Sequence, residues 1–121
     1  MKHFIQSFKF AGKGMWLAVI KQRNLRIHLV ISTLVIFGAY YFEVTNVEWS
    51  MLLLCIGLVI SLELMNTGIE SLVNLVSPEW KESAGRIKDI SAGAVLWSAI
   101  IAAIIGLLIF GDHLLLFFEG M

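Results

Sequence analysis

The chain has 121 residues, of which 59% are hydrophobic and 15% charged, and its formal net charge is zero. This composition excludes a disordered protein and a nucleic-acid-binding protein, and it predicts a single membrane-embedded domain over residues 1–121. The one cysteine, Cys55, lies inside an apolar run and excludes a disulfide framework. We expect no cleavable signal peptide, because the first twenty residues lack a continuous apolar core.

Residues 3–20 are predicted to form an amphipathic helix. The apolar side chains that recur at helical spacing are Phe4, Phe8, Ala11, Met15 and Val19. Lys9 and Lys13 fall elsewhere on the helical wheel. A basic, aromatic helix of this kind is typical of the membrane surface, and the alternative is a helix packed on the membrane-spanning ones. The surface position is favoured because so small a protein has little soluble body.

Three apolar stretches are predicted to cross the membrane, which requires about 20 residues of helix each. They cover residues 27–44, 49–76 and 90–110. A polar hinge at residues 21–26 precedes the first span. The second is expected to end at Ser77-Pro78, because a residue before proline resists the helical conformation. The third is expected to end at Gly111-Asp112-His113, after a hydrophilic connector at residues 79–89.

The basic residues predict the orientation. All nine Lys and Arg residues fall within residues 2–26 and 81–88. The ionisable side chains of residues 43–48 and of the tail after Gly111 are acidic, apart from His113. The positive-inside rule places the basic segments in the cytoplasm. We therefore expect a multi-pass protein of the cytoplasmic (inner) membrane, with the N-terminus in the cytoplasm and the C-terminus outside.

The second span carries a polar face in its later half. Glu63, Asn66, Glu70 and Asn74 follow one another at steps of three, four and four, which places them on one side of a helix. Ionisable groups at membrane depth cost roughly 2.5–3.5 kcal/mol each and usually mark a functional path or site. The alternative is that these residues only form hydrogen bonds with neighbouring helices. The predicted topology places Glu70 at the cytoplasmic headgroup level and Glu63 about 10 Å deeper.

Several reactive groups should meet at this level. Carboxylates can hold Mg²⁺, which commonly takes one or two of them together with substrate phosphates. A partly desolvated glutamate suits a general base acting on a hydroxyl, and Lys88, Arg23 and Arg26 offer charge to phosphate oxygens. These features fit phosphoryl transfer from a soluble nucleotide to a membrane lipid. Because no GxxxxGK[ST] loop or kinase catalytic loop is present, an ion or proton conduit fits the residues equally well.

The run Glu63-Leu-Met-Asn66-Thr-Gly-Ile-Glu70, followed eighteen residues later by Lys88-Asp89, resembles the signature of small bacterial membrane lipid kinases. These are the prokaryotic diacylglycerol kinases and the related undecaprenol kinases. The resemblance covers nearly the whole chain. It implies an all-α integral membrane fold with an N-terminal surface helix and three transmembrane helices per subunit. It also implies a homotrimer with composite active sites between subunits, a membrane lipid substrate, and ATP with Mg²⁺ as the phosphoryl donor.

The resemblance also implies roles for individual residues. Glu63 would be the catalytic base on the lipid hydroxyl, and Asn66 would contact the lipid beside it. Glu70 would bind the metal that bridges the nucleotide phosphates. The nucleotide would be held by polar side chains at Lys13, Asn66, Asn74, Lys88 and Asp89.

Two positions depart from the family pattern. The family commonly has a glutamate where this chain has Gln22, which would share metal binding with Glu70, and often an aspartate where this chain has Asn74. An amide can supply one oxygen ligand but no charge, so metal affinity is expected to fall. A catalytically weak or inactive structural relative is therefore one alternative to the kinase, and a small membrane transport or pore protein is another.

The resemblance gives two indications of the lipid. Residues 24–28 are similar to members from Gram-positive bacteria, which favour undecaprenol, whereas residues 85–89 look more like the diacylglycerol kinases. The expected substrate is therefore diacylglycerol or undecaprenol, and the product phosphatidic acid or undecaprenyl phosphate.

Overall fold

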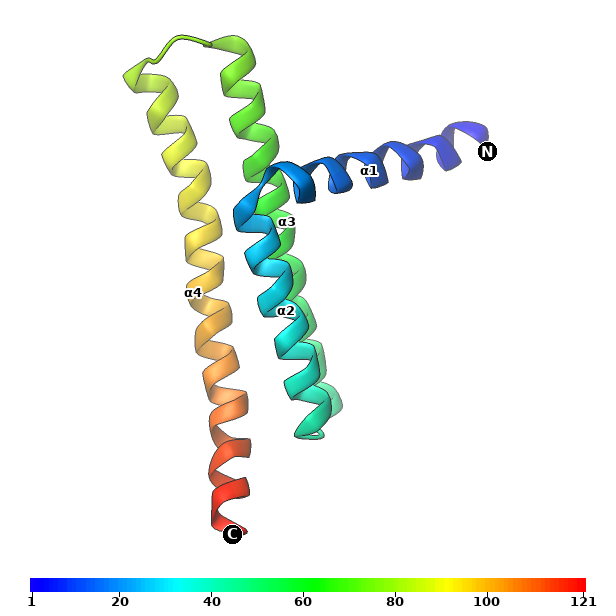
Figure 1. Cartoon of the computed structure of the whole chain (residues 1–121), viewed down its shortest axis with the longest axis vertical. Helices are drawn as coiled ribbons and strands as arrows, with labels where there is room; N and C mark the ends of the chain where they lie inside the picture. The colour runs from blue at the N-terminus through cyan, green and yellow to red at the C-terminus, as the bar shows by residue number, and fades with distance from the viewer.

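The structure, a computed structural model, describes residues 1–121 as four helices. They are α1 (Lys2–Lys21), α2 (Arg23–Tyr41), α3 (Asn46–Val76) and α4 (Glu82–Glu119). In Figure 1, α2, α3 and α4 run alongside one another in alternating directions, and α1 projects sideways from its junction with α2. Because α2, α3 and α4 are each long and apolar enough to cross a membrane, the predicted all-α fold with three spans is confirmed. The surface position of α1 and the homotrimer stay predictions.

The break between α1 and α2 is one residue long. Gln22 adopts an extended conformation, with φ −107° and ψ 111°. Nη1 of Arg26 donates to the carbonyl oxygens of Val19 at 2.8 Å and Ile20 at 2.6 Å. Two of the carbonyls that a helix end leaves without partners are thereby satisfied from within α2. The predicted hinge over residues 21–26 is therefore wrong in extent, and α2 begins at Arg23 rather than at residue 27.

The turn between α2 and α3 occupies residues 42–45. Oγ1 of Thr45 accepts from the backbone N–H of Glu48 at 3.1 Å, and Oε1 of Glu48 accepts from the backbone N–H of Thr45 at 3.0 Å. This reciprocal capping box satisfies two donors that a helix start leaves free. It also starts α3 at Asn46, ahead of the expected position 49. The helix ends at Val76, next to Ser77-Pro78.

The last helix is longer than its apolar stretch. α4 begins at Glu82, inside the expected connector, and continues through residues 111–113, where the span was expected to end. Charged residues interrupt the hydrophobicity there without breaking the helix, and Nε2 of His113 lies 3.1 Å from Oε1 of Glu48 on α3. The 38 residues of α4 extend about 57 Å, against about 30 Å for the hydrocarbon layer of a bilayer. The helix therefore reaches well beyond the membrane core.

The buried core lies at the end of the bundle that contains the α2–α3 turn. It consists of four buried apolar side chains: Ala39, Val44, Leu52 and Ile109. The Phe42 ring packs beside it, with its centroid 6.1 Å from that of Phe110 and 6.4 Å from that of Phe117. Only 12 of the 121 residues are buried, so most apolar side chains are left to contact lipid or other subunits.

The same arrangement separates charge along the bundle. Residues 21–26 and 81–88 lie in the half with the α3–α4 connection, while residues 43–48 and the C-terminus lie toward the opposite end (Figure 1). This separation is what the predicted orientation requires. Which end faces the cytoplasm stays a prediction.

Candidate active site

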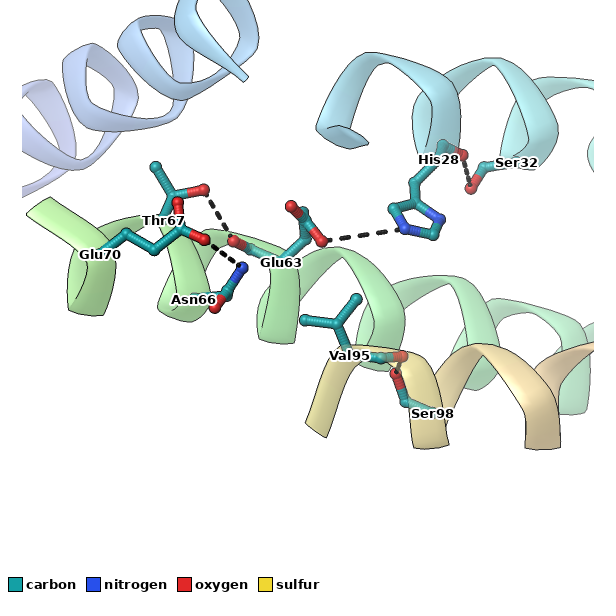
Figure 2. Close-up of polar contacts among 8 residues, drawn as sticks. All are labelled: His28, Ser32, Glu63, Asn66, Thr67, Glu70, Val95 and Ser98. Carbon is teal, nitrogen blue, oxygen red and sulfur yellow. Dashed lines mark hydrogen bonds and ion pairs between the residues drawn. The ribbon is translucent and has the colours of Figure 1, made fainter. Parts of the chain in front are cut away.

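The polar face of α3 is the centre of the candidate active site. Glu63 and Asn66 are buried, with 2% and 6% of their surface exposed, whereas Glu70 is half-buried and Asn74 is exposed. The face therefore passes from a covered to an open environment along one helix. Figure 2 shows that α2 and α4 flank the covered part.

Glu63 is the only acidic residue of the chain that is buried. Its carboxylate accepts no hydrogen bond from the chain, and the side chain that approaches it from α2 is His28, whose Nε2 lies 3.8 Å from Oε2 (Figure 2). The backbone oxygen of Glu63 accepts a hydrogen bond from Oγ1 of Thr67 at 2.9 Å. A buried carboxylate without donors is costly, so this group is suited to receive a hydrogen bond from a bound hydroxyl.

Asn66 and Glu70 form a connected pair one turn further on. Nδ2 of Asn66 donates to Oε1 of Glu70 at 3.3 Å, and Oδ1 of Asn66 is buried without a partner. A buried acceptor of this kind needs a donor or a cation. Its oxygen and the Glu70 carboxylate fit Mg²⁺ that arrives with nucleotide phosphates, which needs only one or two carboxylates from the protein. The chain holds no cluster of three acidic, histidine or cysteine side chains that could bind a metal by itself.

Asn74 and Lys88 connect α3 to α4. The ammonium group Nζ of Lys88 donates to Oδ1 of Asn74. The amide carries no charge, so this contact leaves the positive charge of Lys88 available to a phosphate oxygen. The effect of Asn74 on metal or nucleotide binding stays a prediction.

Three other residues of the predicted site lie apart from these contacts. Gln22 lines a hollow of about 360 Å³ between α1 and α3, together with Thr67 and other side chains. The ammonium of Lys13 lies 5.9 Å from the centre of the Phe10 ring on its own helix. Asp89 is exposed, and its carboxylate makes no hydrogen bond or ion pair. A single chain thus joins Asn66 to Glu70 and Asn74 to Lys88, but it brings none of these three side chains into a polar contact with them.

His28 is the site residue that the sequence analysis missed. It entered there only within residues 24–28, the run that is similar to members from Gram-positive bacteria. A signal was present: counting equally in both directions from the α2–α3 turn places His28 within about one helical turn of the level of Glu63. That count could not show that the two side chains face each other.

Comparison with known proteins finds one matching family and several similar kinases. Residues 9–110 match the family described as Prokaryotic diacylglycerol kinase. The chain is 39% identical over 110 residues to the undecaprenol kinase of Bacillus subtilis, covering 91% of this chain and 89% of that protein. It is 40% identical over 105 residues to the diacylglycerol kinase of Synechocystis sp., covering 86% of this chain and 60% of that protein. It is 28% identical over 109 residues to the diacylglycerol kinase of Escherichia coli, covering 90% and 89% of the two chains.

Proposed function

The chain belongs to the prokaryotic diacylglycerol kinase family and is a lipid kinase, and on that premise we propose that it transfers a phosphoryl group from ATP to the hydroxyl of diacylglycerol or undecaprenol. One observation supports this most directly. The buried Glu63 carboxylate has no donor in the chain, and it shares a helix face with the connected pair of Asn66 and Glu70. The base for an apolar alcohol thus lies on the buried part of this helix face, and the groups for a charged nucleotide follow it toward the exposed part.

The residues divide the chemistry between them. Glu63 accepts the proton of the lipid hydroxyl as the alcohol oxygen forms its bond to the terminal phosphorus of ATP. The bond from that phosphorus to the bridging oxygen breaks, and ADP leaves with the electron pair. Lys88 offers its charge to the phosphate oxygens, while Glu70 and the free oxygen of Asn66 would hold Mg²⁺. When bound, Mg²⁺ supplies charge neutralisation on the transferred group.

The direction of α1 supports a site at the membrane surface. α1 leaves the bundle sideways (Figure 1). The hollow that it forms with α3 is lined on the α3 side by Leu64, Thr67, Gly68 and Ser71. If α1 lies in the headgroup layer, Glu63 sits just below that layer and Glu70 within it. We place this layer on the cytoplasmic side, where ATP is available, with the N-terminus in the cytoplasm and the C-terminus outside.

Assembly of several chains would complete the site. Lys13, Gln22 and Asp89 make no polar contact with Glu70 within one chain, and most apolar side chains of the spans are exposed. A homotrimer with composite sites would bury such surfaces and supply the missing groups from a neighbouring subunit.

The test offers both alcohols to the purified protein in one vesicle preparation, with labelled ATP and Mg²⁺. We expect labelled phosphatidic acid or undecaprenyl phosphate, and the ratio of the two products identifies the preferred lipid. Absence of transfer to either alcohol at all Mg²⁺ concentrations would contradict the kinase and favour an inactive relative. Ion flux through the vesicles without nucleotide would favour a pore.

The sidedness is tested separately. A cysteine introduced beside Lys88, in a Cys55→Ser background, should react with an impermeant maleimide only from the cytoplasmic side of the membrane. Labelling from the outside would place Glu63 and Glu70 out of reach of cytoplasmic ATP.

A further inference from the structure

The side chain of His28 is directed from α2 toward the Glu63 carboxylate. Figure 2 shows the imidazole extending across the space between the two helices, with Nε2 facing Oε2 at 3.8 Å. Only two ion-pair contacts occur in the whole chain, and this is the one at the candidate site. His28 retains 22% of its side-chain exposure, whereas Glu63 retains 2%. The imidazole therefore connects an enclosed acid to a more open region.

The surroundings of this pair contain few other charges. His28 borders an apolar hollow of about 260 Å³ between α2, α3 and α4, to which α4 contributes only alanine, glycine and phenylalanine side chains. The other carboxylate on this face of α3 is that of Glu70, about two turns along the helix. Arg26, on the same helix as His28, is directed to the carbonyls at the end of α1. An interaction between imidazole and carboxylate is strengthened in such an apolar setting.

We infer that His28 is a positioning residue for the catalytic base: it donates from Nε2 to Oε2 of Glu63 and directs the other carboxylate oxygen to the lipid hydroxyl. This inference rests on the proposed kinase function for its consequence in catalysis. At 3.8 Å the pair is longer than a hydrogen bond, and contacts of this kind in active sites often shorten when substrate binds. Both the Nε2–H tautomer of neutral imidazole and the imidazolium can donate at this nitrogen.

The role follows from what Glu63 lacks. A base must present one oxygen to its substrate in a narrow range of directions, and misplacement by about 1 Å can cost up to 100-fold in rate. No other side chain donates to this carboxylate, so without His28 its rotation is restricted only by packing. A hydrogen bond donated by Nε2 of His28 would also favour the ionised carboxylate, which is the form that accepts a proton.

The kinetic test compares three variants with the wild-type protein. We expect His28→Ala to lower kcat by about 10- to 100-fold with little change in KM for ATP, and to move the acid limb of the rate–pH profile to higher pH. His28→Gln keeps a donor near the position of Nε2 and should recover much of the rate, as should imidazole added to His28→Ala. Ser32→Ala is the matched control, because Ser32 borders the same hollow and contacts only the backbone oxygen of His28.

Two outcomes would overturn the inference. One is wild-type turnover in His28→Ala. The other is a lowered rate with an unmoved pH profile and no recovery by glutamine or imidazole, which would indicate a packing role alone.

A second measurement does not depend on turnover. With nitrogen-labelled histidine, Glu63→Gln should shift the NMR signal of Nε2 of His28 and leave that of His113 unchanged. Glu48→Gln should do the reverse, because Glu48 contacts His113. An unshifted His28 signal in Glu63→Gln overturns the pair even in an active enzyme. A shifted signal in a protein that phosphorylates neither alcohol would keep the pair and contradict the proposed function instead.

Discussion

The two ends of the bundle are stabilised in different ways. At the end with the α2–α3 turn, four buried apolar side chains pack together, and the polar groups of Thr45, Glu48 and His113 satisfy one another. At the other end, the Glu63 carboxylate has no donor and Oδ1 of Asn66 has no partner. The one buried side-chain oxygen without a hydrogen-bond partner therefore lies at the end with the polar face. The comparison indicates that ligands are expected to bind at the end with the polar face, rather than at the end with the α2–α3 turn.

The largest contrast is expected between two glutamates of α3. Glu63→Gln removes the base and should lower phosphoryl transfer by about 10²–10⁴-fold, the usual contribution of a general base. Glu48→Gln, at the satisfied end, keeps an acceptor for the capping box and should retain near wild-type transfer. Initial rates with labelled ATP measure both, and elution from a sizing column in detergent checks assembly. Substantial activity in Glu63→Gln would remove this residue from the role of base.

The next effect concerns stability at the packed end. Leu52 is 3% exposed and Leu58 is 53% exposed on the same helix. Leu52→Ala should lower the free energy of unfolding by about 1–2 kcal/mol, less than in soluble proteins because lipid already solvates apolar groups in the reference state. Leu58→Ala should change it by much less, and neither should alter the Mg²⁺ requirement. Denaturant titration in detergent measures the difference. If both substitutions lowered the free energy of unfolding equally, the packing around Leu52 would not be a main source of stability.

At the open end, a smaller effect is expected on metal use. Glu70→Gln keeps the hydrogen bond from Asn66 but removes the charge, so the Mg²⁺ concentration for half-maximal rate should rise by about tenfold, equivalent to about 1.4 kcal/mol. Glu79→Gln, in the exposed α3–α4 connection, is the matched control and should leave the Mg²⁺ curve unmoved. A Glu70→Gln curve that overlays the wild type would exclude Glu70 as the metal ligand.

The smallest effect is expected at the helix cap. Thr45→Ala removes the acceptor for the backbone N–H of Glu48 and should cost about 1 kcal/mol of unfolding free energy. Thr33→Ala removes a hydroxyl that contacts only its own helix, through Leu29, and should cost less. The same denaturant titration compares the two. Activity should be kept in both, because the cap lies at the end away from the polar face.

Local periodicity explains what could be predicted from the sequence. The polar face of α3 follows from spacing alone, because Glu63, Asn66 and Glu70 stay on one side of any regular helix. Helix ends were less predictable. The start of α2 depends on Arg26 reaching the carbonyls of α1, and the continuation of α4 accompanies a contact between His113 and a helix far away in the chain.

Contacts between helices could not be predicted from the sequence pattern. The approach of His28 to Glu63 depends on how α2 rotates against α3, and spacing along one helix does not determine that rotation. For the same reason the hydrogen bond from Lys88 to Asn74 could not be predicted from spacing alone. The assigned roles of the site residues stay predictions until the variants above are measured.

The one-residue junction at Gln22 has a mechanical consequence. Because Arg26 donates to the carbonyls of Val19 and Ile20, hydrogen bonds link the last turn of α1 to the first turn of α2, and the two helices form a corner. A corner with one arm lying flat on a bilayer resists tilting of the other arm, and tilting is the usual way for a helix to adapt to membrane thickness. If α1 lies flat on the bilayer, as predicted, a change in acyl-chain length should raise or lower the Glu63 carboxylate relative to the water boundary, and turnover is then expected to depend on bilayer thickness.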